Sequence, residues 1–147
     1  MSKIFNAVIT AVALVSAPLA AHATATIVHV KLEDKTTGPK IKGMVMDADK
    51  TSVPAGKVTF MVTNESKALV HEMIVMHAAL PVTKFPYNKA TQRAIESKMH
   101  SMGEVSETRP GKSGTLTVNL KPGNYVLMCN QPGHLMSGMY EKFVVTK

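Results

Sequence analysis

Three residues near the C-terminal end of the chain have side chains that bind soft metal ions. Cys129, His134 and Met139 follow one another with four residues between each pair, in the pattern C-x4-H-x4-M. A thiolate, an imidazole and a thioether form a soft ligand set, which selects copper over magnesium, calcium or manganese. The chain has one cysteine, which excludes an internal disulfide, a CxxC redox pair and a cysteine-rich zinc site. We therefore predict that this segment binds copper.

A near-trigonal copper site also needs a second imidazole from another part of the chain. His71 is the best candidate, because it lies in an apolar segment where an unpaired imidazole would be costly to bury. His77 lies roughly 20 Å further along the same predicted strand, at ~3.3 Å per residue, and cannot reach the same ion. His29 and His100 are expected at the surface.

The segments that hold these residues have the pattern of a small β-protein. Runs rich in β-branched and alternating apolar residues predict strands at residues 27–32, 41–46, 57–63, 68–76, 114–120, 125–129 and 140–145. Residues 35–39, 53–56 and 121–124 have turn composition, and the last of these predicts a hairpin. Such strands favour a β-sandwich or barrel over alternating βαβ units. Residues 89–100 contain good helix formers, and we expect a short helix there, packed as a flap.

Length and composition limit the class of protein further. The 147 residues are enough for one domain with a hydrophobic core and leave little room for a second. A hydrophobic fraction of 45% argues against a disordered chain. The sequence has no Gly-rich phosphate loop, so it gives nucleotide chemistry no support.

The first 23 residues have the features of a secretory signal peptide. Lys3 provides a positive start, residues 4–19 are mostly apolar, and the segment ends in Ala21-His22-Ala23. We expect cleavage after Ala23, which leaves residues 24–147 as a single domain in the periplasm. Because Lys3 is the only charged residue removed, the net charge falls from +7 to +6. An exported chain with one thiol fits a cysteine that is buried or bound to metal.

The chain resembles the cupredoxins, the type-1 blue-copper family of plastocyanin, azurin and rusticyanin. The resemblance includes the run from Val53 to Phe60, the upstream His71 and the strand-loop-strand of residues 125–145. The spacing of the C-terminal ligands is similar to that of rusticyanin and auracyanin, whereas plastocyanin has a shorter Cys-to-His loop. The resemblance implies an all-β fold, a Greek-key β-sandwich with one type-1 copper near one end. It also implies that His71, Cys129 and His134 are equatorial ligands and that Met139 is a weak axial ligand.

One residue departs from the family pattern. Many cupredoxins have Asn after the upstream histidine, where it braces the ligand loop, and this chain has Glu72. A carboxylate that points toward the site would stabilise the oxidised copper and lower the reduction potential. Strand alternation instead predicts that Glu72 points away from the face that carries His71.

Three functions are open to such a protein. The first is a mobile one-electron carrier. The second is a periplasmic copper-handling cupredoxin that gives copper tolerance by binding or sequestering copper, which the 11 methionines favour. The third, a copper enzyme, is disfavoured because copper enzymes of this kind place histidine beside the blue-copper cysteine, and here the neighbours are Met128 and Asn130.

The remaining expectations concern partners and a second metal site. The 17 Lys and Arg against 10 Asp and Glu would steer the protein toward an acidic redox partner or an anionic membrane surface. We expect no membrane anchor, no nucleic-acid partner and a monomeric chain. The apolar loop around His134, including Leu135 and Met136, is expected at the surface as the docking patch. Met99, His100 and Met102 are candidates to hold a second Cu(I).

Overall fold

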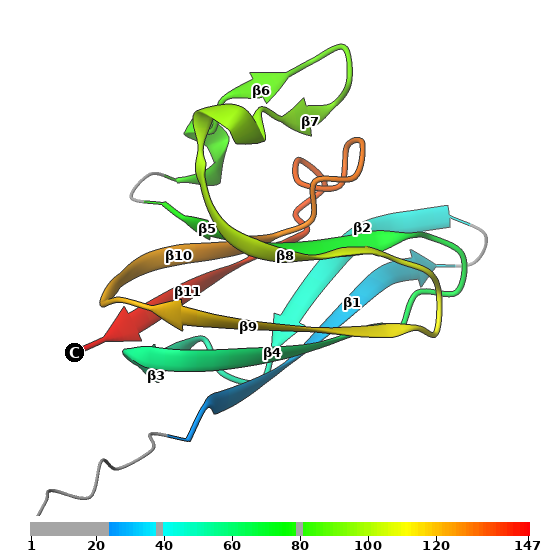
Figure 1. The fold of residues 1–147 in the computed structure, drawn as a ribbon. Helices are drawn as coiled ribbons and strands as arrows, with labels where there is room; N and C mark the ends of the chain where they lie inside the picture. The colour runs from blue at the N-terminus through cyan, green and yellow to red at the C-terminus, as the bar shows by residue number, and fades with distance from the viewer. Residues whose placement is uncertain (1–23, 38–39, 79–80) are drawn as a thin grey trace, which may run out of the picture.

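The computed structural model describes residues 24–37, 40–78 and 81–147 (Figure 1). The predicted signal peptide, residues 1–23, and two residues of the predicted turn at 35–39 lie outside the described residues. No helix in the described part of the chain has the length and apolar character needed to cross a membrane.

Two β-sheets pack face to face, as the sequence predicts. The first, sheet A, has the order β2 (Lys40–Ala48), β1 (Thr26–Thr37), β4 (Gly56–Asn64), β9 (Ser113–Leu120). The second, sheet B, has the order β3 (Ser52–Pro54), β11 (Tyr140–Thr146), β10 (Gly123–Met128), β5 (His71–His77), β8 (His100–Thr108). The pairs β1–β4 and β11–β3 are parallel and the other pairs in these sheets are antiparallel. The all-β Greek-key sandwich is therefore confirmed.

The main core lies between the two sheets and follows from period-2 alternation. In β4, Val58, Phe60 and Val62 are fully buried, while Met61 between them is exposed. Phe60 packs edge-to-face against Phe143 of sheet B, with ring centroids 5.4 Å apart. These inward residues bury the apolar area that holds the sheets together.

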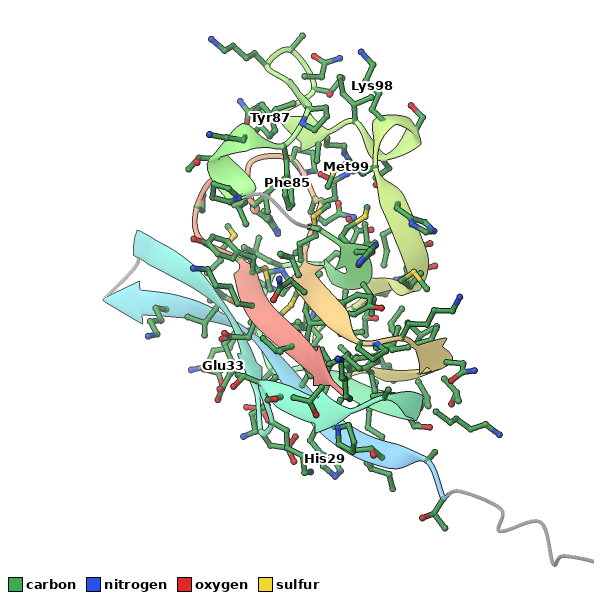
Figure 2. The ribbon with its side chains drawn as sticks, turned by 90° about the vertical axis from the view of Figure 1, so that its left-hand side faces the viewer. His29, Glu33, Phe85, Tyr87, Lys98 and Met99 are labelled. Carbon is green, nitrogen blue, oxygen red and sulfur yellow. The ribbon has the colours of Figure 1, made fainter. Side chains whose placement is uncertain are left out.

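A second apolar cluster covers the outer face of sheet B. Ile74 and Met76 of β5 point away from the main core, and residues 82–99 fold over them as the predicted flap. The flap consists of the 3-10 helix η1 (Val82–Lys84), the short strands β6 (Tyr87–Asn88) and β7 (Arg93–Ala94), and the 3-10 helix η2 (Glu96–Lys98). In Figure 2, Phe85, Tyr87, Lys98 and Met99 lie in this flap, far from His29 and Glu33 of sheet A. Since both faces of β5 are covered, every residue from His71 to Met76 is buried.

The structure corrects four details of the sequence prediction. The helical part of residues 89–100 is limited to the single 3-10 turn η2. Residues 100–108 form β8, which was not predicted because its sequence lacks apolar alternation and only Val105 and Thr108 are buried. Residues 53 and 54, predicted in a turn, belong to β3 (Ser52–Pro54) beside β11, and the strand expected from residue 68 begins at His71.

Candidate metal centre

The loop between β10 and β11 contains three of the predicted ligands. Cys129 directly follows β10, and its N–H donates to the Met139 carbonyl (3.1 Å), which closes the loop at its base. The Met139 N–H in turn donates to the His134 carbonyl (3.0 Å). Gly133 and Gly138 have φ values of 80° and 95°, which glycine adopts without strain. The loop therefore folds back on itself and directs His134 toward Cys129.

The structure brings His71 of β5 together with Cys129 and His134 of the loop between β10 and β11. His71 Nδ1 lies 3.1 Å from His134 Nδ1, and Cys129 Sγ lies 3.4 Å from the same nitrogen. The three ligand atoms are all within 4.8 Å of one another. Atoms bonded to one ion at about 2.0–2.3 Å in a trigonal arrangement lie roughly 3.5 Å apart, so these side chains fit one ion with little movement.

Met139, the predicted axial residue, lies close to this group in the fold. Its side chain is fully buried in the same core cluster as Cys129, and its backbone bonds to Cys129 and His134. The role of its thioether as an axial ligand stays a prediction.

Burial sets the protonation of the three side chains. Loss of solvent raises the pKa of the Cys129 thiol to about 11 and lowers the pKa of His134 to about 4, with a further lowering from His71. Burial also lowers the pKa of His71, and the Asp34 carboxylate partly offsets this effect. Without metal at pH 7, the site therefore holds a protonated thiol and two neutral imidazoles.

We expect Cu(II) binding at pH 7 to release about one proton per chain, because the thiolate is the ligand and the pKa of the free thiol is about 11. The apparent affinity should rise about tenfold per pH unit between roughly pH 7 and pH 10, where both imidazoles are neutral and the thiol is protonated. Titration calorimetry in two buffers with different ionisation enthalpies measures the proton count. Release of no proton would show that Cys129 is already ionised in the metal-free protein.

Asp34 has a buried side chain near the site, and the sequence analysis did not single it out. Its side chain is 4% exposed, and its Oδ1 lies 3.8 Å from His71 Nε2. Neither atom has a hydrogen-bond partner among the described residues. The distance is too long for a hydrogen bond, but a movement of roughly 1 Å would form one. A metal on Nδ1 leaves the proton of the ring on Nε2, so His71 would then donate to Asp34.

A sequence signal for Asp34 does exist. Positions 28, 30 and 32 of β1 are Val, Val and Leu with side chains that face the core, and position 34 continues this series. A carboxylate at an inward-facing position is costly unless it has a partner. The alternation of β1 therefore indicates a polar partner on the other sheet, and that partner is His71.

Glu72 occupies the opposite face of β5 from His71, as the alternation predicts, and still contacts the ligand loop. Its Oε1 accepts a hydrogen bond from the Asn130 N–H (2.9 Å), the amide directly after Cys129. Burial raises the pKa of Glu72, and the bond from Asn130 partly offsets that rise. Glu72 therefore braces the ligand loop, the function that the resemblance implies for Asn at this position.

The side chain of Asn130 connects the ligand loop to the flap. Its Oδ1 accepts from the Ala94 N–H (2.7 Å), and its Nδ2 donates to the Ala94 carbonyl (3.1 Å) and to Glu96 Oε1 (2.6 Å). The Gly133 N–H also donates to the Gln92 carbonyl (2.8 Å). Polar contacts of this kind around metal ligands hold them in a fixed geometry.

Three other histidines among the described residues lie outside this group. His29 is exposed on β1, and its backbone N–H donates to Asp49 Oδ1. His77 and His100 are exposed at the far end of β5 and the start of β8. The expectation that His29 and His100 lie at the surface is confirmed, and His77 is at the opposite end of β5 from His71.

Known proteins resemble this chain in both sequence and fold. A sequence profile of copper-binding proteins of the plastocyanin/azurin family matches residues 32–146. Reduced auracyanin from Roseiflexus castenholzii has a TM-score of 0.61 and 23% identity, over 85% of this chain and 99% of auracyanin. Rusticyanin from Thiobacillus ferrooxidans has a TM-score of 0.58 and 20% identity, over 84% of this chain and 79% of rusticyanin. An azurin from Methylomonas sp. strain J has a TM-score of 0.60 and 13% identity, over 84% of this chain and 100% of that azurin. No curated protein matches by sequence.

The profile covers most of the described chain, including all of the residues from His71 to Met139. The solved structures share the sandwich architecture, and the three buried donor atoms suit one soft ion. The chain belongs to the plastocyanin/azurin family of copper-binding proteins, the cupredoxins, and its cofactor is one copper ion.

Proposed function

We propose that this protein is a one-electron carrier with a type-1 copper bound by His71, Cys129 and His134, with Met139 as the weak axial ligand. The observation that supports this proposal is the convergence of two imidazole nitrogens and one thiol within 4.8 Å at a buried position. Copper in such a site changes between Cu(I) and Cu(II), which is the redox chemistry of an electron carrier. We propose no enzymatic activity.

The protein's contribution to electron transfer is a rigid ligand frame. His71 is held within a buried strand, and Cys129 is held by the loop-closing bond to Met139. Glu72 fixes the amide that follows Cys129. Ligands that cannot move keep one geometry for both oxidation states, so electron transfer needs little reorganisation.

The first test is a titration of the metal-free protein with Cu(II), with visible absorbance measured against copper bound per chain. We expect an intense blue or green thiolate band that saturates at one copper. The absence of a thiolate band would overturn the proposed ligand set.

The docking patch for a redox partner is smaller than the sequence predicts. Met136 is 49% exposed beside His134, but Leu135 is 1% exposed and packs in the cluster under the flap. The expectation that Leu135 lies at the surface is therefore wrong. We propose that partners dock over Met136 and exchange electrons through the partly accessible edge of His134, which is 9% exposed.

Met136→Lys should lower the electron self-exchange rate about tenfold, which equals a loss of ~1.4 kcal/mol in docking. The matched control is Met61→Lys. This variant adds the same charge on sheet A, where Met61 is 43% exposed. The visible band should be unchanged in both variants. Equal rates in the two variants would count against this docking patch.

Asp34 should lower the reduction potential, because its carboxylate faces His71 Nε2 and favours the more positive oxidised site. The Asp34 charge lies roughly 8 Å from the ion, and Coulomb's law at an effective dielectric constant of about 20 gives the size of its effect. Asp34→Asn should therefore raise the reduction potential by an amount on the order of 50–100 mV. Glu33→Gln is the control, since it removes the same charge from the neighbouring position of β1. Voltammetry that finds equal shifts in the two variants would remove Asp34 from this role.

The setting of the protein is also a proposal. We propose that residues 1–23 direct export to the periplasm and that residues 24–147 act there as a monomeric domain. The excess of 17 Lys and Arg over 10 Asp and Glu favours an acidic redox partner. A membrane surface with anionic lipids is a weaker candidate, and nucleic acid is not a proposed partner.

A further inference from the structure

Two histidines face each other at the end of β5 that lies opposite the copper site. His77 is the last residue of β5 and pairs with His100, the first residue of β8. Their ring centroids are 5.8 Å apart, and both side chains are exposed. The ring hydrogen bonds within the described chain involve only His71 and His134. The ring nitrogens of His77 and His100 are therefore available to a ligand.

The spacing of this pair suits a shared metal ion. Two imidazoles that bind one ion through bonds of about 2.0 Å have ring centroids roughly 5–6 Å apart. The observed 5.8 Å lies in that range. Because the two residues are paired across neighbouring strands, the sheet holds their spacing before any ion arrives, which lowers the entropic cost of binding.

A methionine completes this group on one side. His77, His100 and Met102 line the same hollow of about 290 Å³ beside the turn between β9 and β10. His77 Nε2 lies beside Gly123, where a Cβ would come within 3.2 Å of it, so the absence of a side chain at that position leaves room next to the nitrogen. Met99 lines a separate hollow on the other side of the histidine pair.

The chemistry of the hollow selects the ion. A thioether is a soft ligand that favours Cu(I), and imidazole also suits copper. Lys121 lines the same hollow, and Lys84 and Lys98 line the neighbouring one. This positive charge disfavours a divalent ion more than a monovalent one.

We propose that His77, His100 and Met102 form a second metal site, which takes one Cu(I). His77 is separated from His71 by the length of β5, roughly 20 Å at ~3.3 Å per residue, so the two sites share no ligand. A chain with this site holds two copper ions, and it could accept or deliver one while the other stays bound. That property is what a copper-handling role requires, in addition to electron transfer.

The test is a titration with Ag(I), a redox-inert ion with the same charge and ligand preference as Cu(I). The protein is first loaded with one copper, which is then reduced to Cu(I). Because Cu(I) and Ag(I) are both diamagnetic, the NMR signals stay sharp. We expect the ring signals of His77 and His100 and the methyl signal of Met102 to shift and to saturate at one added equivalent. The methyl signal of Met99 should not shift.

Four variants localise the site. His77→Ala and His100→Ala should each weaken Ag(I) binding at least about tenfold. The matched controls are His29→Ala, an exposed histidine on the other sheet, and Met99→Leu, and both should bind Ag(I) as the original chain does. Circular dichroism checks that each variant is folded.

Two results would overturn the second site. One is an original chain that binds no Ag(I) beyond its first copper, and the other is binding that survives both His77→Ala and His100→Ala. Because the signals of His77 and Met102 report this site directly, failure here is distinguishable from failure of the type-1 site, which is read from the thiolate band.

Discussion

Cys129→Ser should abolish the visible charge-transfer band and lower copper affinity at least about a thousandfold, or ~4 kcal/mol. Cys129 is the only thiol in the chain, so no other residue can supply a thiolate to the ion. The hydroxyl of serine is a hard and weakly acidic donor, which suits copper poorly. Competition with a chelator of known affinity measures the loss, and absorbance spectroscopy measures the band.

The fold should survive this change, because serine is close in size to cysteine and can still bond to His134 Nδ1, which lies 3.4 Å from Sγ. Circular dichroism and a urea titration of the metal-free proteins therefore serve as the control. A variant that binds copper within tenfold of the original affinity would place the metal elsewhere in the chain.

Asn64→Ala should lower the free energy of unfolding by about 2–4 kcal/mol, a large part of the 5–15 kcal/mol that stabilises a typical domain. The Asn64 side chain is fully buried and makes three hydrogen bonds. Its Nδ2 donates to the carbonyls of Leu69 (2.9 Å) and Thr108 (2.7 Å), and its Oδ1 accepts from the Ser66 N–H (2.9 Å). Alanine leaves these backbone groups without their partner.

The matched control for Asn64 is Asn88→Ala. Asn88 also bonds to the backbone, where its Oδ1 accepts from the N–H groups of Ala90 and Thr91, but it is exposed, so water can replace it. Its loss should cost under about 1 kcal/mol. Urea unfolding of both metal-free variants measures the difference, and similar losses in the two would show that burial of Asn64 is not the cause.

Asp34 and Asn64 show what sequence reasoning can predict and where it stops. Each follows three buried apolar residues at inward positions of its strand, and Leu32 of β1 pairs with Asn64 of β4. The alternation predicts that both side chains face inward. It does not reveal that Asp34 meets His71 and that Asn64 meets Thr108, since those partners lie on another sheet.

The ligands themselves were predictable because few residue types bind soft metals. Cysteine and histidine at a fixed spacing narrow the site to a handful of residues, and a buried histidine needs a partner. His71, Cys129 and His134 were predicted from the sequence and converge in the structure. The position of the Met139 thioether depends on the path of the loop, which residue types do not fix.

The flap was the least predictable element, because some of its backbone groups form hydrogen bonds with a distant segment of the chain. Residues 89–100 contain helix formers, but the Ala94 N–H and carbonyl both bond to the side chain of Asn130. Those backbone groups are therefore not available to continue a helix. A local propensity of a few tenths of a kcal/mol per residue cannot compete with such fixed tertiary bonds.

The same bonds limit how the site could be transplanted by protein engineering. Residues 129–139 contain three of the four proposed ligands, yet Asn130 and Gly133 in that stretch are bonded to Ala94 and Gln92 of the flap. A scaffold that received the loop without the flap would leave the Asn130 amide and the Gly133 N–H without these partners. The smallest portable unit is thus discontinuous and contains the loop, residues 92–96 and the start of β5 with His71.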